Sequence, residues 1–172
     1  MAYMKVDVES DGPISGDYSM ISFGAVLVYE QLDKTFYGQL NPISDKFVPE
    51  ALAVSGHSRA EILAFEATQK VMLDFAEWIK AVCKDSPIFI SDNNGFDWMF
   101  ICSYFHHFIG KKPFGFSSQR LGSLYKGIVK DTTKNFKHLC KTKHTHHPVD
   151  NAKGNAEALL RLKSEFGLKV RF

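Results

Sequence analysis

Two acidic side chains close to the start of the chain are spaced to act together. Asp7 and Glu9 flank one residue of a Met-Lys-Val-Asp-Val-Glu run over residues 4–9, which is typical of a strand. Side chains two apart on a strand share a face, so both carboxylates point away from Val6 and Val8. On a buried strand such a pair repels itself unless a cation lies between the oxygens, and hard divalent ions prefer these ligands. An edge strand with solvated acids has the same pattern, so the local sequence leaves both options open.

A second candidate lies in residues 91–100, SDNNGFDWMF. This segment follows a short apolar run and opens a helical pattern, so Asp97 falls in the first helical turn. An acid there is also favoured by the helix dipole. Asp92 and Asn93 suit the cap position. Local context alone therefore does not separate a functional Asp97 from a structural one.

The third candidate is a group of three histidines, His144, His146 and His147, immediately before the last helical pattern. Imidazole exchanges protons near neutral pH, which suits a general base. Asn151 follows five residues after His146. Gly154 weakens the start of this helix unless another segment must approach it closely.

A zinc site is a competing interpretation of this region, with Cys140, His144 and His146 as ligands. No paired cysteines and no matching partner motif accompany them. The three cysteines, which include Cys83 and Cys102, are odd in number and lack a CxxC pair. We therefore expect free thiols in a reducing cytosol, and a cytoplasmic protein. No secretory signal or membrane-length apolar run is expected from the sequence.

The small net charge of +2 conceals a strong asymmetry. Residues 111–147 hold nine Lys or Arg and one acidic residue, whereas residues 1–110 hold seven Lys or Arg and fifteen acidic residues. An acidic body beside a basic strip suits a protein that holds metal ions next to phosphates. A solvated basic loop is the alternative.

The surrounding pattern predicts one mixed α/β domain over residues 1–172 with a central sheet. Its first three strands form an antiparallel meander. Expected strands cover residues 4–8, 19–29, 34–40 and 87–91. Two short helices are expected to begin at Pro49 and Ser58. Four further helices are expected over residues 68–82, 95–108, 119–127 and about 150–166. Residues 110–118 and 128–149 are expected to be irregular.

Together, the three clusters resemble the DEDDh family of 3′–5′ exonucleases, in that family's order along the chain. Asp7-Val8-Glu9 looks like the first motif, residues 93–97 (Asn-Asn-Gly-Phe-Asp) like the second, and His146 with Asn151 and Ala152 like the third. The surrounding sequence, as in HHPVDNAKGNAEALL, is similar to that of a phage and bacterial exoribonuclease-like branch of this family. The resemblance implies the ribonuclease H-like fold and covers most of the chain.

One departure from the family pattern concerns the fourth carboxylate, because Asn151 stands at its place. Asp150 is adjacent, but one residue rotates a helical side chain by roughly 100°. An amide keeps a carbonyl oxygen and loses the charge, so metal affinity should fall. Asn151 implies either a naturally weakened enzyme or a substitution made to trap substrate.

The resemblance further implies two Mg²⁺ or Mn²⁺ ions about 3.5–4 Å apart, held by Asp7, Glu9, Asp97 and Asn151. His146 would deprotonate the attacking water, and mononucleotides would leave from the 3′ end of a single strand. The expected substrate contacts are the backbone at Ser10, Asp11 and Gly12, near the terminal sugar, and Phe96, on a base.

Two alternatives remain at this point. A nucleic-acid-binding relative that has lost hydrolysis would explain Asn151. An RNase H-like endonuclease would instead cut internal phosphodiester bonds and would also cut circular single strands. The branch resemblance favours RNA slightly over DNA. It also makes a homodimer plausible.

Overall fold

The computed structural model describes residues 2–170. The elements in chain order are β1 (Tyr3–Ser10), β2 (Met20–Val28), β3 (Thr35–Gln39), α1 (Pro49–Val54), α2 (Arg59–Leu63), α3 (Thr68–Val82), β4 (Ile88–Ser91), α4 (Asn94–Ile109), β5 (Ser118–Arg120), α5 (Leu121–Val129), a 3₁₀ turn (Lys137–Leu139) and α6 (Pro148–Phe166).

The strands form one mixed sheet in the order β3-β2-β1-β4-β5. The first three strands pair antiparallel, and β4 and β5 join β1 in parallel. All nine residues of β2 are buried, which explains its nearly continuous apolar sequence. The predicted central sheet with an antiparallel first half is therefore confirmed.

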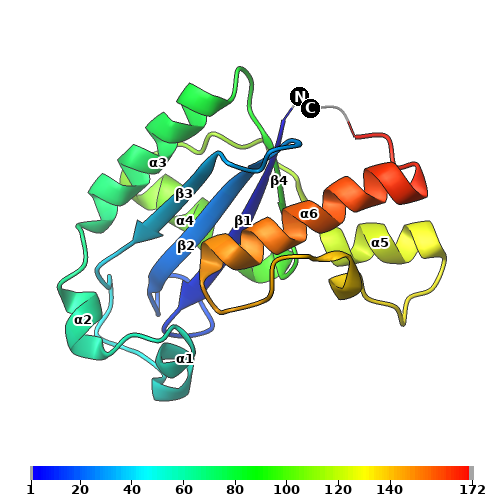
Figure 1. The fold of residues 1–172 in the computed structure, drawn as a ribbon. Helices are drawn as coiled ribbons and strands as arrows, with labels where there is room; N and C mark the ends of the chain where they lie inside the picture. The colour runs from blue at the N-terminus through cyan, green and yellow to red at the C-terminus, as the bar shows by residue number, and fades with distance from the viewer. Residues whose placement is uncertain (1, 171–172) are drawn as a thin grey trace.

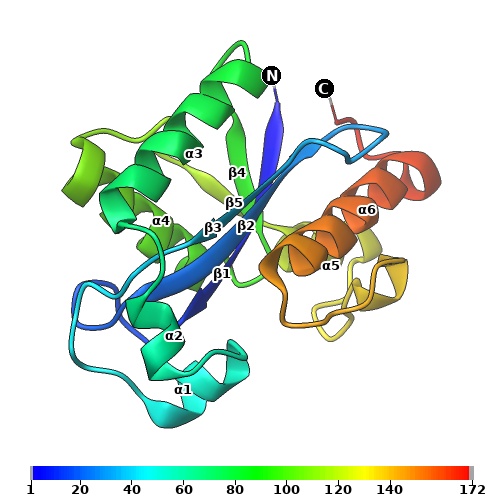
Figure 2. The ribbon, with the colours of Figure 1, turned by 60° about the vertical axis from the view of Figure 1, so that its left-hand side comes forward.

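Helices cover both faces of the sheet (Figures 1 and 2). Helices α3 and α4 cover one face, around the buried rings of Phe23, Phe75 and Phe105. Helices α5 and α6 cover the other, where Ala152, Ala156 and Leu159 of α6 are buried. Because alternate residues of β1 serve opposite faces, Val6 and Val8 enter the first core and Asp7 faces away from it.

Most predicted elements are confirmed, and the differences are local. The predicted boundaries of α3 match, and Ser58 and Glu61 form the expected capping box at α2. Strand β5 was missed because three polar residues, Ser-Gln-Arg, carry no apolar alternation. Helix α5 therefore begins at Leu121 rather than 119, and α6 begins at Pro148, whose fixed φ suits a first helical position.

Two glycines allow α6 to lie close to its neighbours. A Cβ on Gly24 would lie 2.4 Å from the carbonyl carbon of Pro148, and Gly24 pairs directly with Asp7 across the β1–β2 ladder. A Cβ on Gly154 would lie 2.7 Å from the carbonyl oxygen of Thr142. The close approach expected at Gly154 is thus confirmed. The contact at Gly24 places the first turn of α6 on β2, at the residue that pairs with Asp7.

The three cysteines are free thiols, as expected. Among residues 2–170, no helix combines the length and apolar character needed to cross a membrane.

Candidate active site

The three predicted carboxylates and the predicted histidine line one cavity of about 720 Å³. Asp7 and Glu9 come from β1, Asp97 from the first turn of α4, and His146 from the segment before α6. Asn151 and Phe96 line it too. The basic side chains on its wall are Lys137, Lys141 and Lys143. Sequence segments that are far apart therefore converge as the motif pattern predicts.

Asp97 is held in the interior at this site, with 2% of its surface exposed. Its Oδ1 accepts a hydrogen bond from the backbone N–H of Val8, at 3.2 Å. Its Oδ2 is buried and has no hydrogen-bond partner among residues 2–170. A buried carboxylate oxygen without a partner costs free energy, and a cation in the cavity would supply the missing interaction.

Asn151 is bonded to Asp7 instead of repelling it. The Asn151 Nδ2 donates to Asp7 Oδ2 at 3.1 Å. The Asn151 Oδ1 lies 2.6 Å from His144 Nδ1 and accepts from the Thr145 N–H at 3.3 Å. The amide thus ties β1 to the histidine segment, a contact that an ionised aspartate could not make because both partners would then be acceptors.

His146 stands in a strained part of this segment. Its φ of +61° is in the left-handed region, which is uncommon for residues other than glycine. Its ring lies 4.6 Å from the ring of His144. A strained backbone beside a polar cavity is a frequent feature of functional sites, and the exposed side chain of His146 lies on the cavity wall.

The electrostatics of the cavity show that the carboxylates repel each other. Burial, with Asp7 and Asp97 adding repulsion, raises the pKa of Glu9 to about 8. Burial and Asp7 raise the pKa of Asp97 to about 7, although Lys5 acts against them. Burial also raises the pKa of Asp7, opposed by Lys5 and by the hydrogen bond from Asn151. Glu9 therefore holds a proton at neutral pH that a divalent cation would displace.

The donor set fits divalent metal ions, which prefer oxygen ligands. Asp7, Glu9 and Asp97 could hold them, with the Asn151 carbonyl oxygen as a neutral fourth ligand. Within residues 2–170, however, no three His, Cys, Asp or Glu side chains stand close enough together to form a ready-made metal site.

Sequence reasoning missed Lys5, which is 1% exposed and lies two residues before Asp7 on the same face of β1. Its Nζ donates to the Val6 carbonyl oxygen at 3.1 Å. Burial lowers the pKa of Lys5, while Asp97 and Asp7 favour its charged form. The Lys5 amine acts against the raised pKa of Asp7 and Asp97. The two-residue period of the strand was the signal that could have identified it.

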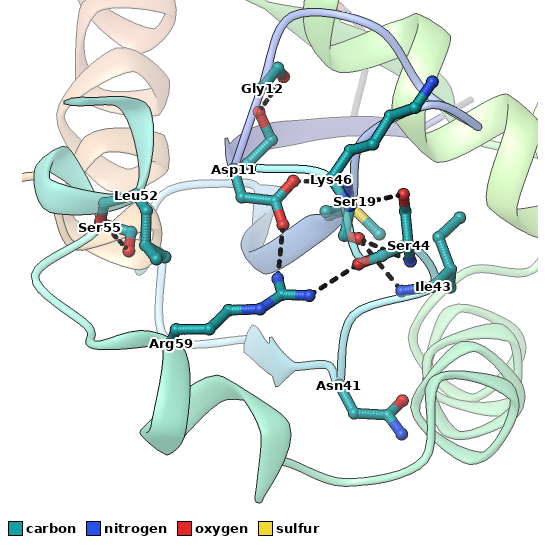
Figure 3. A network of polar contacts seen from close by, with 12 residues as sticks. Asp11, Gly12, Ser19, Asn41, Ile43, Ser44, Lys46, Leu52, Ser55 and Arg59 are labelled. Carbon is teal, nitrogen blue, oxygen red and sulfur yellow. Dashed lines mark hydrogen bonds and ion pairs between the residues drawn. The ribbon is translucent and has the colours of Figure 1, made fainter. Parts of the chain in front are cut away.

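The predicted sugar contacts at Ser10, Asp11 and Gly12 belong to a network at the end of β1 (Figure 3). Asp11 is fully buried, and its carboxylate accepts from the Ser19 N–H at 2.6 Å and from Arg59 at 3.1 Å. Its backbone N–H and C=O bond to Ser19 and Val48.

This network holds the loop in place and leaves Asp11 without a free group for substrate. The Ser10 hydroxyl in turn donates to the Gly12 carbonyl oxygen at 2.7 Å. Of the four predicted substrate contacts, Phe96 is the one that lines the cavity.

Comparisons with known proteins agree with the fold and the motifs. No family model matches the chain. The 3′–5′ DNA exonuclease Cap18 of Escherichia coli is 42% identical over 130 residues, which are 73% of this chain and 68% of that protein.

Solved structures share the fold at low identity. The nuclease domain of 3′hExo, a DEDDh family member bound to rAMP, has a TM-score of 0.74 at 14% identity, over 99% of this chain and 96% of that one. The zinc-bound E. coli ExoI–ssDNA complex has a TM-score of 0.73 at 15% identity, over 95% of this chain and 40% of that one. These structures share the ribonuclease H-like fold, and the 42% identity to Cap18 over more than two thirds of both chains shows that the chain belongs to the DEDDh family of 3′–5′ exonucleases.

Proposed function

We propose that this chain hydrolyses the last phosphodiester bond at the 3′ end of a single strand, with divalent metal ions held by Asp7, Glu9 and Asp97. The unpartnered Asp97 Oδ2, facing two further carboxylates in one cavity, is the observation that supports this most strongly. Burial raises the pKa of all three carboxylates, and Asp7 raises the pKa of Glu9 and Asp97 further, which a protein without a use for these groups gains nothing from.

The side chains around the cavity divide the chemistry among them. His146 accepts the proton of the attacking water, because its imidazole is on the cavity wall and imidazole is the commonest general base. Lys137 and Lys141 face the same space and attract the phosphates of the strand. Phe96 stacks on the terminal base. Bound to the carboxylates, a pair of Mg²⁺ or Mn²⁺ ions would supply positive charge for the phosphate and for the leaving 3′ oxygen.

The loop of Ser10, Asp11 and Gly12 has a supporting role in this proposal. Arg59 and Ser19 hold Asp11, so the loop forms a fixed wall beside the end of β1.

Asn151 makes this a weakened enzyme in our proposal. A neutral amide is the poorer metal ligand, and here it is also engaged with Asp7 and His144. The same bonds favour a second candidate, a relative that binds nucleic acid without cutting it, since they stabilise the cavity in the absence of ions.

DNA is the first substrate to test. The relative that is 42% identical is named a DNA exonuclease, whereas the resemblance gave a slight preference for RNA. Residues 1–172 act as a single exonuclease domain in this proposal. The homodimer remains a prediction that sedimentation would check.

A labelled strand separates the candidate functions. With Mn²⁺, a 5′-labelled single strand should give a ladder that shortens from the 3′ end, and a blocked 3′ end should stop it. Asp97→Asn should abolish the ladder, while Asp74→Asn, an exposed residue of α3, should leave it intact. A stable gel shift without shortening would favour the binder, and cuts in a circular strand would favour an endonuclease.

A further inference from the structure

Phe116 is exposed in a way that folding does not explain. It is 98% exposed, the highest value among the large hydrophobic side chains of residues 2–170. It lies in the loop between α4 and β5, two residues after the buried Phe114. A lone exposed apolar residue is ordinary, but this ring has a defined cationic neighbour.

That neighbour is Lys112, whose Nζ lies 4.7 Å from the centre of the Phe116 ring and 5.5 Å from that of Trp98. Both distances are within the range of cation–π attraction. Trp98 is anchored in turn, since its ring packs 4.9 Å from Phe89 and 6.1 Å from Phe114. The three side chains Trp98, Lys112 and Phe116, here called the Phe116 platform, thus form an aromatic–cation–aromatic surface on a firm base.

The platform is joined to the rim of the active-site cavity. Asn94 donates from Nδ2 to the Ser118 Oγ at 2.8 Å, and Ser118 is two residues from Phe116. Two residues span at most about 7 Å. Asn93, next to Asn94, lines the cavity, and Arg120 donates to the carbonyl oxygen of Asp92 at 3.1 Å. The β5 edge therefore connects the cavity with the platform.

We infer that the Phe116 platform binds an unpaired nucleobase of the substrate strand, upstream of the nucleotide being removed. The ring of Phe116 offers a solvent-facing surface on which any base can stack, and Lys112 lies where an adjacent phosphate would pass. This inference deepens the proposed function and rests on it.

The positive charge around the Phe116 platform favours a nucleic-acid strand as its partner. Lys111 and Lys112 belong to the 111–147 segment with its nine basic residues and one acidic residue, which complements a polyanion. A second copy of the chain would bring an equal excess of positive charge wherever it used this same segment. Self-association through the platform is therefore disfavoured, and it becomes one outcome of the test.

Substrate length provides the test. Kinetics of 3′ trimming should be measured on a dinucleotide, which cannot reach the platform, and on a strand of about a dozen nucleotides. Phe116→Ala should raise KM for the long strand about tenfold, with kcat and dinucleotide cleavage unchanged. Phe116→Trp should restore the long-strand KM. Because Phe116 is nearly fully exposed, the substitution should leave the fold intact.

A matched control and a second readout keep the outcomes distinct. Phe166→Ala removes a part-exposed ring at the end of α6 and should leave the cleavage kinetics of both substrates unchanged. Anisotropy of the labelled long strand with EDTA should show the same loss of affinity for Phe116→Ala without any turnover. Equal affinity of parent and variant would overturn the inference, as would a variant that alters only sedimentation. If the parent trims neither substrate, the proposed function fails and anisotropy alone decides on the platform.

Discussion

Replacing Asn151 with aspartate should convert a stable metal-free site into one that needs metal. In the present chain, Asn151 Nδ2 donates to Asp7 Oδ2 at 3.1 Å. Asn151→Asp puts a carboxylate oxygen at that place. The substitution keeps the side-chain shape, so its effect reports the charge and the lost donor.

The free-energy cost of Asn151→Asp in the absence of metal can be calculated from this distance. Two unit charges 3.1 Å apart repel by about 5 kcal/mol at an effective dielectric constant near 20. Taking up a proton at pH 7 limits the penalty to about 4 kcal/mol, because an aspartate ordinarily titrates about three pH units lower. The contacts of residue 151 with His144 and Thr145 remain and offset part of it. We therefore expect Asn151→Asp to lower the free energy of unfolding by about 2–4 kcal/mol without metal.

Thermal unfolding in EDTA and in Mn²⁺ measures this effect. For a chain of this size, the loss corresponds to a fall in Tm of about 5–10 °C in EDTA. In Mn²⁺ the order should reverse, because the added carboxylate strengthens metal binding and bound ions stabilise the folded state. The rate of 3′ trimming in Mg²⁺ should rise as well.

Asn151→Ala is the control, since it loses the bond to Asp7 together with the contacts to His144 and Thr145 and adds no carboxylate. It should melt lower than the parent in EDTA and gain no extra stabilisation from Mn²⁺. The reasoning would be refuted if Asn151→Asp were as stable as the parent in EDTA, or if Mn²⁺ stabilised both proteins equally.

Three other predictions concern the proton acceptor, the position of α6 and pH. His146→Ala should slow 3′ trimming by about 10²–10⁴-fold while Mn²⁺ still raises the Tm, and the exposed His106→Ala should have no effect; near-parental trimming would remove His146 from the mechanism. Gly24→Ala should destabilise the chain by about 1–3 kcal/mol in chemical denaturation and weaken Mn²⁺ binding, because its Cβ would lie 2.4 Å from the Pro148 carbonyl carbon; unchanged values for both would contradict this packing. Glu9 keeps its proton up to about pH 8 when folded but loses it near its ordinary pKa of 4.5 when unfolded, so the folded state binds more protons between these values. The unfolding free energy in EDTA should therefore fall as pH rises from about 5 to 8, and Glu9→Gln should flatten this slope; an equal slope in both proteins would speak against the Glu9 assignment.

Elements with strong local signals could be predicted from the sequence. The apolar period of residues 68–82 and the Ser58–Glu61 pair are local, and their structures match. Strand β5 could not be predicted, because its three polar residues become a strand only by pairing with β4. Long-range pairing of this kind produces no recognisable pattern in the sequence of the strand itself.

For the site, too, the residues could be predicted from the sequence, whereas the contacts between them could not. Residue types and order were enough to predict that Asp7, Glu9 and Asp97 share a cavity with His146. The bond from Asn151 to Asp7 depends on how closely α6 approaches β1. Gly24, the residue of β2 that pairs with Asp7, allows that approach, and it follows from tertiary packing that no local pattern encodes.

The central claim is that Asp7, Glu9 and Asp97 bind the catalytic ions, and anomalous scattering from a crystal soaked in Mn²⁺ and a nucleoside monophosphate tests it most directly. We predict anomalous density between these three carboxylates, with the phosphate of the nucleotide beside it and His146 facing the phosphate. Density at the histidines alone, or none at the carboxylates under conditions in which the protein trims a strand, would contradict the proposed mechanism.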